Sequence, residues 1–311
     1  MSASRWEEVN CPICPTGTGN ASYLRCSDRL QEPLFKNYQL RRCVGCGLVY
    51  LNPRPLSDDA AEHYPEAGYD PFLSLNSGNG LFDRAYRISR CFTLAWKQRL
   101  VKRLTPRGSG ILDVGCGTGE FLDALKTDYQ TMGIEPEPNA AKWARERLGL
   151  TVYTGGWEAL PTGETNFDLI TMWHVLEHIP DPLATLRAVA ERLTPAGKLL
   201  IALPNIAALD AAIYRSEWVA LDAPRHLWHF TPATLTRLAS QAGFILKYRG
   251  MLPLDPFYNI LGSERLKVAI HGRWQVLLTP LRASFAALAS MIWGLTTGNH
   301  SGIIYIFARQ S

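Results

Sequence analysis

The feature that most constrains this chain is a glycine-rich segment, Ile111-Leu112-Asp113-Val114-Gly115-Cys116-Gly117-Thr118-Gly119. A short apolar run leads directly into three glycines at alternate positions, and a helical pattern follows. Glycine tolerates positive φ angles and lets the backbone approach a ligand closely. The segment therefore predicts a buried strand, a ligand-binding turn and a helix, as in open α/β sheets that bind ligands at the carboxyl ends of their strands.

Strand and helix patterns alternate from residue 110 onward. Short apolar strands are predicted at 110–114, 132–135, 151–154, 167–173, 198–203, 244–249 and 302–308, with helices at 119–127, 138–148, 181–193 and 232–242. Continuous apolar strands suit a parallel sheet that is covered on both faces. We predict an α/β fold with a doubly wound, seven-stranded, Rossmann-like sheet.

Three regions follow from this pattern. Residues 1–55 are predicted to form a small module, and residues 56–106 a helical linker or lid that contains a long helix, Leu81 to Leu104. Residues 107–311 are predicted to form the ligand-binding domain. Within that domain, residues 250–301 are expected to form a helical cap inserted before the last strand.

An acidic residue, Glu135, ends the second strand, where a carboxylate can accept hydrogen bonds from both hydroxyls of a ribose. The glycine spacing is G-x-G-x-G, which differs from the G-x-G-x-x-G of dinucleotide binders. The segment resembles the class I S-adenosylmethionine-dependent methyltransferases. The resemblance implies S-adenosylmethionine as cofactor, with Asp113, Gly115 and Gly117 around its methionine part and Glu135 on its ribose.

The resemblance covers about residues 105–250. Gly156 stands where this family has its adenine-binding aspartate, so we expect the Trp157 backbone N–H and ring to contact the adenine. The remaining residues that we assign to the cofactor site are Cys116, Gly119, Pro136 and Trp173.

Four histidines fall in two short windows, His174-Val175-Leu176-Glu177-His178 and His226-Leu227-Trp228-His229. If a helix begins at residue 174, then His174, Glu177 and His178 share one face at the carboxyl edge of the sheet. Methyl transfer to a hydroxyl requires the removal of one proton, and histidine suits that task near neutral pH. His174 and His178 are candidate bases, with His226 and His229 as acceptor-site residues; the alternative for His178 is a purely structural turn.

The H-x-x-E-H pattern with a distal histidine also resembles the E-x-x-E-H metal site of some RNA-terminal and ubiquinone-pathway methyltransferases. In this chain His174 replaces the first glutamate, and imidazole ligands shift metal preference away from magnesium toward softer ions. The pattern leaves open whether His174, Glu177 and His178 hold a second metal.

Two C-x-x-C pairs, Cys11/Cys14 and Cys43/Cys46, mark the N-terminal region. Four thiolates can bind a structural Zn²⁺ tetrahedrally and replace the core that so short a segment lacks. The layout of a zinc-ribbon-like module before a methyltransferase domain resembles bacterial enzymes of sugar, polysaccharide and natural-product pathways. That resemblance supports methyl transfer as the reaction, but it says less about which molecule accepts the methyl group.

Composition limits the classes of molecule that this chain is expected to bind. The formal net charge is only +4, and the region 1–55 lacks a basic stretch interleaved with aromatic residues, so no nucleic acid is expected. We expect methylation, most simply O-methylation, of a small-molecule, saccharide or lipid-linked acceptor. The alternatives are an rRNA base methyltransferase, since some carry an N-terminal zinc module, and a catalytically silent scaffold, which the intact glycine loop and Glu135 argue against.

The start of the chain, MSASRWEEVN, lacks the apolar core of a secretory signal, so we expect a cytoplasmic protein. An apolar stripe with helical spacing lies in the insertion, at Leu277, Leu281, Phe285, Leu288 and Ile292. This stripe packs on the domain or forms a homodimer interface in one interpretation. In the other it makes peripheral contact with a membrane, where nearby Arg and Lys side chains meet anionic headgroups.

Overall fold

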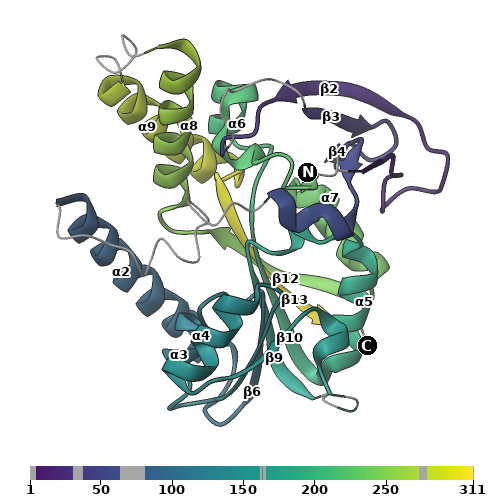
Figure 1. Ribbon diagram of the computed structural model, residues 1–311, viewed down its shortest axis with the longest axis vertical. Helices are drawn as coiled ribbons and strands as arrows, with labels where there is room; N and C mark the ends of the chain where they lie inside the picture. Colours follow the sequence, from purple (N-terminus) through teal and green to yellow (C-terminus); the bar gives the residue numbers. More distant parts are fainter. Residues whose placement is uncertain are drawn as a thin grey trace.

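The computed structural model describes residues 5–30, 38–63, 81–161, 163, 166–272 and 279–310. Figure 1 shows a central sheet with helices on both sides, a small β-module formed by the N-terminal region, and a helical pair, α8 and α9, near α6.

The central sheet has seven strands, which confirms the predicted fold class. In spatial order they are β12 (Phe244–Met251), β13 (Gly302–Arg309), β10 (Leu193–Pro204), β9 (Phe167–Trp173), β6 (Gly110–Val114), β7 (Gln130–Glu135) and β8 (Thr151–Thr154). Strand β13 runs antiparallel to both of its neighbours, whereas the strands from β10 to β8 are parallel. The chain winds outward in opposite directions from β6 and β9, so the topological switch point lies between these two strands.

Helices cover both faces of the sheet. Helices α2 (Leu81–Leu104), α3 (Glu120–Asp123) and α4 (Pro138–Leu148) lie on one side, and α5 (Pro182–Arg192) and α7 (Pro232–Gln241) on the other (Figure 1). Successive strand residues alternate between the two cores: Leu199 and Ile201 pack in one, and Leu200 in the other. Because both faces are buried, the strands need apolar residues throughout. Helix α3 is shorter than the predicted 119–127, since the backbone after Asp123 continues as turns.

The cysteine module is built on a four-stranded antiparallel sheet. Its order is β11 (Trp228–His229), β4 (Val49–Leu51), β3 (Tyr38–Cys43) and β2 (Asn20–Cys26), and a separate pair joins β1 (Trp6–Glu7) to β5 (Arg54–Pro55). The fourth strand of this sheet thus comes from the far part of the chain. The division at residues 55 and 106 stays a prediction, and the sheet shared by β4 and β11 runs across it.

The insertion before the last strand is helical, as predicted. It contains α8 (Asp255–His271) and α9 (Thr279–Thr297), which pack near α6 (Leu209–Tyr214); Arg273, Trp274, Leu277 and Leu278 lie outside the described residues. The buried side of α9 carries small residues, Ala283, Ala286, Ser290 and Gly294. Its large apolar residues point outward: Leu281, Phe285, Leu288, Ile292 and Leu295 are each more than half exposed.

Short 3₁₀ helices complete the fold. They are η1 (Ser57–His63), η2 (Trp157–Ala159), η3 (Leu176–His178), η4 (Arg215–Glu217) and η5 (Val219–Leu221). No helix within the described ranges combines the length and the apolar character that crossing a membrane requires.

Candidate functional site

The glycine loop leaves the carboxyl end of β6 as the sequence predicts. Gly115, Gly117 and Gly119 all have positive φ, at 70°, 56° and 82°. A Cβ atom at Gly115 would lie 2.5 Å from a methyl group of Val175. Glycine is therefore required at this position both by the backbone angle and by the space available.

Glu135 ties the end of β7 to this loop. One carboxylate oxygen accepts a hydrogen bond from the Gly117 N–H at 2.7 Å, and the other accepts one from the Glu137 N–H at 2.9 Å. The side chain is 5% exposed, and burial raises its pKa. Each oxygen retains a lone pair, so a carboxylate in this position can still accept hydrogen bonds from a ligand.

Two titratable groups, a buried carboxyl and a half-buried ammonium, lie beside the loop. The Asp113 carboxylate accepts a hydrogen bond from the Thr171 hydroxyl at 2.6 Å, and burial raises the pKa of Asp113 to about 7. Lys97, on α2, places its ammonium 4.0 Å from the centre of the Trp173 ring, and burial lowers the pKa of Lys97 to about 8. Among the described residues, no carboxylate lies within ion-pair distance of that ammonium.

Lys97 was not identified from the sequence. It lies on a long helix far from any spacing motif, so no local pattern marks it. Trp173, which was predicted, ends β9 and makes edge-on ring contacts with Phe121 and Trp96 at 5.5 and 6.2 Å. The helix α2 thus covers this end of the glycine loop.

The other predicted cofactor residues lie around the same strand ends. The Gly156 N–H donates to the Glu158 carboxylate at 2.7 Å, and the Trp157 ring stacks under the Arg192 guanidinium at 5.2 Å. Pro136 is exposed directly after Glu135. The Cys116 thiol packs against Gly133 inside the core, where a Cβ atom would be only 2.6 Å from the sulfur, so only the backbone of Cys116 is left for a ligand.

His174 does not begin a helix. Its φ is +56°, and the single turn η3 starts only at Leu176. The His174 imidazole lies 3.5 Å from the Glu177 carboxylate and 3.5 Å from that of Asp255. Burial opposes its positive charge, but Asp255 and Glu177 outweigh burial and raise the pKa of His174 to about 10. A cationic imidazole cannot accept a proton, so His174 is better suited to orient groups than to act as a base at neutral pH.

The cluster with metal-ligand spacing is Glu177, His178 and His226, in place of the predicted trio with His174. One ligand atom from each lies within 4.8 Å of the others, and the two imidazole rings are 4.6 Å apart. The Glu177 side chain is buried, and neither carboxylate oxygen has a hydrogen-bond partner among the described residues. Burial opposes ionisation of Glu177, but the surrounding histidines outweigh it and lower its pKa.

The imidazoles of this cluster are held by backbone carbonyls. His178 Nδ1 lies 3.1 Å from the Arg225 carbonyl, and His226 Nδ1 lies 2.8 Å from the Ala220 carbonyl. Because a carbonyl only accepts, both Nδ1 atoms carry hydrogen, and in the neutral ring Nε2 holds the lone pair. Burial, with the positive field of His226, lowers the pKa of His178 to about 4.

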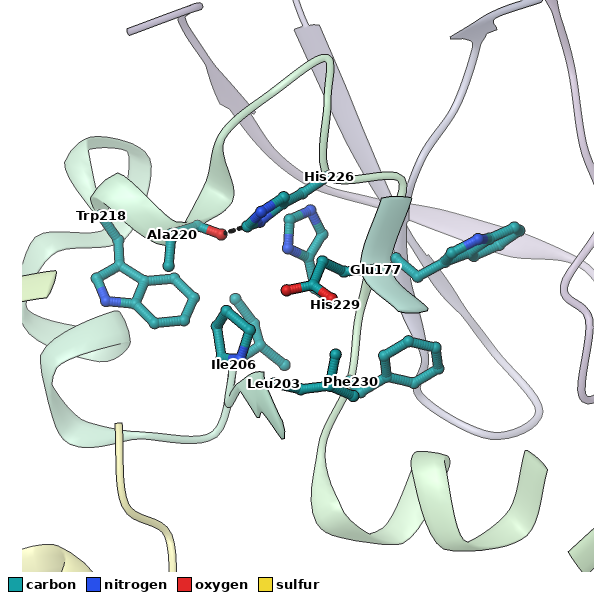
Figure 2. A pocket seen from close by; sticks show the side chains of 10 residues that line it. Glu177, Leu203, Ile206, Trp218, Ala220, His226, His229 and Phe230 are labelled. Carbon is teal, nitrogen blue, oxygen red and sulfur yellow. Dashed lines mark hydrogen bonds between the residues drawn. The ribbon is translucent and has the colours of Figure 1, made fainter. Parts of the chain in front are cut away.

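A closed pocket, with no room for a water-sized molecule, adjoins this cluster (Figure 2). Its acidic and basic side chains are Glu177, His226 and His229, and its apolar wall includes Trp218, Trp228 and Phe230. The His229 ring lies 6.4 Å from that of His226, and burial lowers the pKa of His229 to about 3. Its Nε2 atom is buried without a hydrogen-bond partner among the described residues. The pocket therefore joins two imidazoles, one carboxylate and aromatic walls.

The four predicted cysteines converge at one end of the module. The sulfur atoms of Cys11, Cys14, Cys43 and Cys46 all lie within 4.8 Å of one another, and none forms a disulfide. Burial raises the pKa values of Cys14 and Cys46 to about 11. At Cys43, backbone N–H groups of Cys46 and Gly45 outweigh burial and lower the pKa to about 7.

Comparison with known proteins agrees with this geometry. A protein family described as "Methyltransferase domain" matches residues 84–247. A ubiquinone biosynthesis O-methyltransferase of Xanthomonas axonopodis pv. citri is 31% identical over 170 residues, which span 50% of this chain and 71% of that protein. A protein of the same name from Xanthomonas oryzae pv. oryzae is 34% identical with the same coverage.

The fold recurs in solved structures. A structure assigned as a sarcosine dimethylglycine methyltransferase, from Galdieria sulphuraria, superimposes with a TM-score of 0.50 at 17% identity, over 72% of this chain and 88% of that chain. This likeness concerns the fold alone. Taken together with the glycine loop and the strand order, the family match shows that the chain belongs to the methyltransferase domain family and is an S-adenosylmethionine-dependent methyltransferase.

Proposed function

We propose that the protein O-methylates a hydroxyl group of a small, lipid-linked acceptor. The observation that carries this proposal is the meeting of Glu177, His226 and His229 beside η3, near the strand ends. The space between these side chains is closed in this structure, so an acceptor would have to open it. Two relatives are named as ubiquinone biosynthesis O-methyltransferases, which supports a hydroxyl as the methylated group. A sugar-linked acceptor stays a second possibility, on the resemblance of the module alone.

The cofactor is proposed to lie against the glycine loop. Glu135 would hold the ribose, Asp113 and Lys97 would face the amino and carboxylate groups of the methionine part, and Trp157 would contact the adenine. The assignment of Lys97 rests on its half-buried ammonium, which has no ion-pair partner among the described residues and which a carboxylate would neutralise. The remaining contacts would come from the backbone of Gly115, Cys116, Gly117, Gly119, Pro136 and Gly156, and from the Trp173 ring.

The histidine cluster fits a divalent metal. Its carboxylate is buried and, among the described residues, has a 3.5 Å ion contact with His174 but no hydrogen-bond partner. Its two imidazoles direct Nδ1 to backbone carbonyls, so in the neutral form each would offer the Nε2 lone pair. We propose Glu177, His178 and His226 as ligands, which favours an ion softer than Mg²⁺. Such an ion, when bound, lowers the pKa of a coordinated hydroxyl.

The proton of the acceptor hydroxyl is proposed to move to His229 Nε2. The burial of His229 keeps its ring neutral, as a proton acceptor must be, but it also lowers its pKa to about 3, so the imidazolium would form only with the help of a neighbouring negative charge. The charge of Glu177 favours the imidazolium that would form. His174, held cationic by two carboxylates, would orient groups at the mouth of the site.

The cysteine cluster is proposed to hold one structural Zn²⁺. The four sulfur atoms lie close together, and the pKa values of Cys14 and Cys46 are raised. The four thiols therefore cannot all ionise unless a cation neutralises their charge. All four ligand positions of a tetrahedral ion would be filled by protein, which leaves no open position for catalysis.

The outer face of α9 is proposed to contact a membrane surface. Leu281, Phe285, Leu288, Ile292 and Leu295 form an exposed apolar stripe on this helix, and α8 adds Phe257, Tyr258 and Leu261. Arg282 pairs with the buried Glu264 carboxylate at 2.7 Å, so the contact with anionic headgroups is assigned to Arg265 and Lys267. A double variant, Phe285→Ser with Leu288→Ser, should no longer sediment with anionic liposomes, whereas Ile88→Ser, an exposed position on α2, should still do so. If the wild-type protein does not sediment with liposomes and its molar mass in solution doubles as its concentration is raised, the face is a dimer interface.

Labelled cofactor tests the reaction. The protein is incubated with methyl-labelled S-adenosylmethionine and separately with a lipid extract, soluble small molecules and RNA. Label should enter the lipid fraction, His226→Gln should abolish transfer, and His271→Gln should not, since His271 lies exposed on α8 and pairs with Glu217. Label in RNA, or in no fraction although the cofactor binds, contradicts the proposed function.

A further inference from the structure

The cysteine module carries part of the histidine site as one of its own strands. Strand β11, which contains His229, pairs antiparallel with β4 of the module. The Leu51 N–H donates to the Leu227 carbonyl at 2.9 Å, and the Leu227 N–H donates to the Glu177 carbonyl at 2.8 Å. The segment 222–229 is therefore held between the module on one side and η3 on the other.

A buried guanidinium fastens this segment to the module. Arg225 donates to Asp28, in the module, at 2.7 and 3.2 Å, and to Asp222 at 2.7 Å. The side chains of Arg225 and Asp28 are only 1% and 3% exposed. Arg29 adds a second contact from the module to Asp222 at 2.6 Å. A buried charge that loses one partner is strongly destabilised, so this pairing defines the position of Arg225 closely.

The backbone of the same segment orients the imidazoles. The Arg225 carbonyl accepts from His178 Nδ1, and the Ala220 carbonyl accepts from His226 Nδ1. Both carbonyls flank Asp222, which the two arginines hold in place. A shift of this segment would release the Nδ1 hydrogens and allow the other tautomer, in which Nε2 carries hydrogen and cannot act as a ligand.

We propose that Asp28 and Arg225 are positioning residues, through which the cysteine module fixes the tautomers of His178 and His226. The module is thereby a part of the acceptor site. The effect of the fixed tautomers on metal binding rests on the proposed function. The tautomers themselves can be measured whether or not a metal binds.

The test compares Asp28→Asn with Asp59→Asn in the full chain. Asparagine at position 28 keeps the shape and the oxygen that accepts from the Leu30 N–H, but it removes the charge that faces Arg225. Asp59 also forms an ion pair, but with Arg5 inside the N-terminal region and not with the segment 222–229. Imidazole nitrogen spectra of the isotope-labelled protein report the tautomer of each histidine. Co²⁺ titration of the protein with its cysteine site filled by zinc reports the affinity of the histidine cluster.

Asp28→Asn should produce mixed tautomer signals at His178 and His226 and weaken Co²⁺ binding by at least about tenfold. Asp59→Asn should leave both as in the wild type. Unchanged tautomers in a folded Asp28→Asn protein overturn the proposal. If that variant does not fold, Arg225→Lys is measured instead, because lysine keeps the charge but loses the two-pronged contact. The same changes in tautomer signals and Co²⁺ affinity are expected of it, and unchanged tautomers overturn the proposal. Altered tautomers with no Co²⁺ binding even in the wild type would uphold the positioning role and contradict the proposed metal site.

Discussion

The cofactor pocket and the histidine site meet at the same edge of the sheet, yet they are assembled differently. The backbone of the cofactor pocket comes from Asp113, the glycine loop and Glu135, which lie on two neighbouring strands that follow one another in the chain, and Lys97, Trp157 and Trp173 are added at its margin. The histidine site combines η3 with a segment from residues 220–229, and a third part of the chain, the cysteine module, holds that segment. A site built from one βαβ unit can keep its geometry by itself, whereas a site built from distant segments depends on every segment that supports it.

The largest effect that separates the two sites should follow from Cys43→Ser. We expect loss of the bound zinc and unfolding of the module, because four thiolates replace the core that it lacks. Hydrogen exchange should then show lost protection at the Leu51 and Leu227 amides, while S-adenosylhomocysteine still binds within about threefold. Equal loss of cofactor binding would show that both sites depend on the module and would remove the contrast.

Gly115→Ala should have the opposite pattern. The positive φ of Gly115 and the 2.5 Å approach of Val175 should together cost about 3 kcal/mol, or about 100-fold in cofactor affinity. Zinc content should stay at the wild-type level. Gly108→Ala is the matched control, because Gly108 also has a positive φ, at 86°, but no heavy atom lies within 4 Å of its added Cβ. Calorimetry that finds equal affinities for the two variants would contradict the role of the contact.

A smaller effect is expected from Glu135→Gln. The amide keeps the size of the side chain. In the wild type two backbone N–H groups donate to the carboxylate, and the NH₂ group of glutamine would face one of these donors. The loss should be about 2 kcal/mol, or about 30-fold in cofactor affinity. Glu137→Gln, which alters only the N-terminal cap of α4, should leave affinity within about twofold. Wild-type affinity in Glu135→Gln would disprove the ribose assignment.

The smallest effect concerns pH. Because burial raises the pKa of Asp113 to about 7, the folded chain retains a proton that the unfolded chain loses near pH 4, so the free energy of unfolding falls as pH rises between these values. A cationic cofactor favours the ionised carboxylate. Its affinity should therefore rise up to about tenfold between pH 6 and 8, and Asp113→Asn should abolish this rise. Calorimetry in buffers of different ionisation enthalpy would detect the released proton.

The sequence predicted what depends on neighbours along the chain. The strands at 110–114 and 151–154, the helix 81–104 and the positive φ of the three loop glycines agree with the structure, because apolar periodicity and glycine chemistry are local signals. The four cysteines also converge, since their paired spacing carries its own geometry.

The sequence did not predict contacts that the tertiary fold creates. His174 was grouped with Glu177 and His178 by helical spacing, but the chain turns at His174 with positive φ and His226 takes its place in the cluster. Arg225 and Asp28 meet across 197 positions of sequence, and Lys97 reaches the glycine loop from a helix without a motif. No periodic pattern encodes such pairs, because charged residues at these positions resemble ordinary surface residues until the fold buries them.

The pairing of β4 with β11 also has a consequence for synthesis on the ribosome. Strand β4 is complete once residue 51 has been made, but its partner follows only at residue 228. At about 5–20 residues per second, this interval lasts roughly 10–35 seconds. During that time the edge of the nascent module presents unpaired backbone groups, which other chains can pair with. Two arginines, Arg41 and Arg42, lie on β3, the strand next to this edge, and like charges there would repel a second copy of the same growing module.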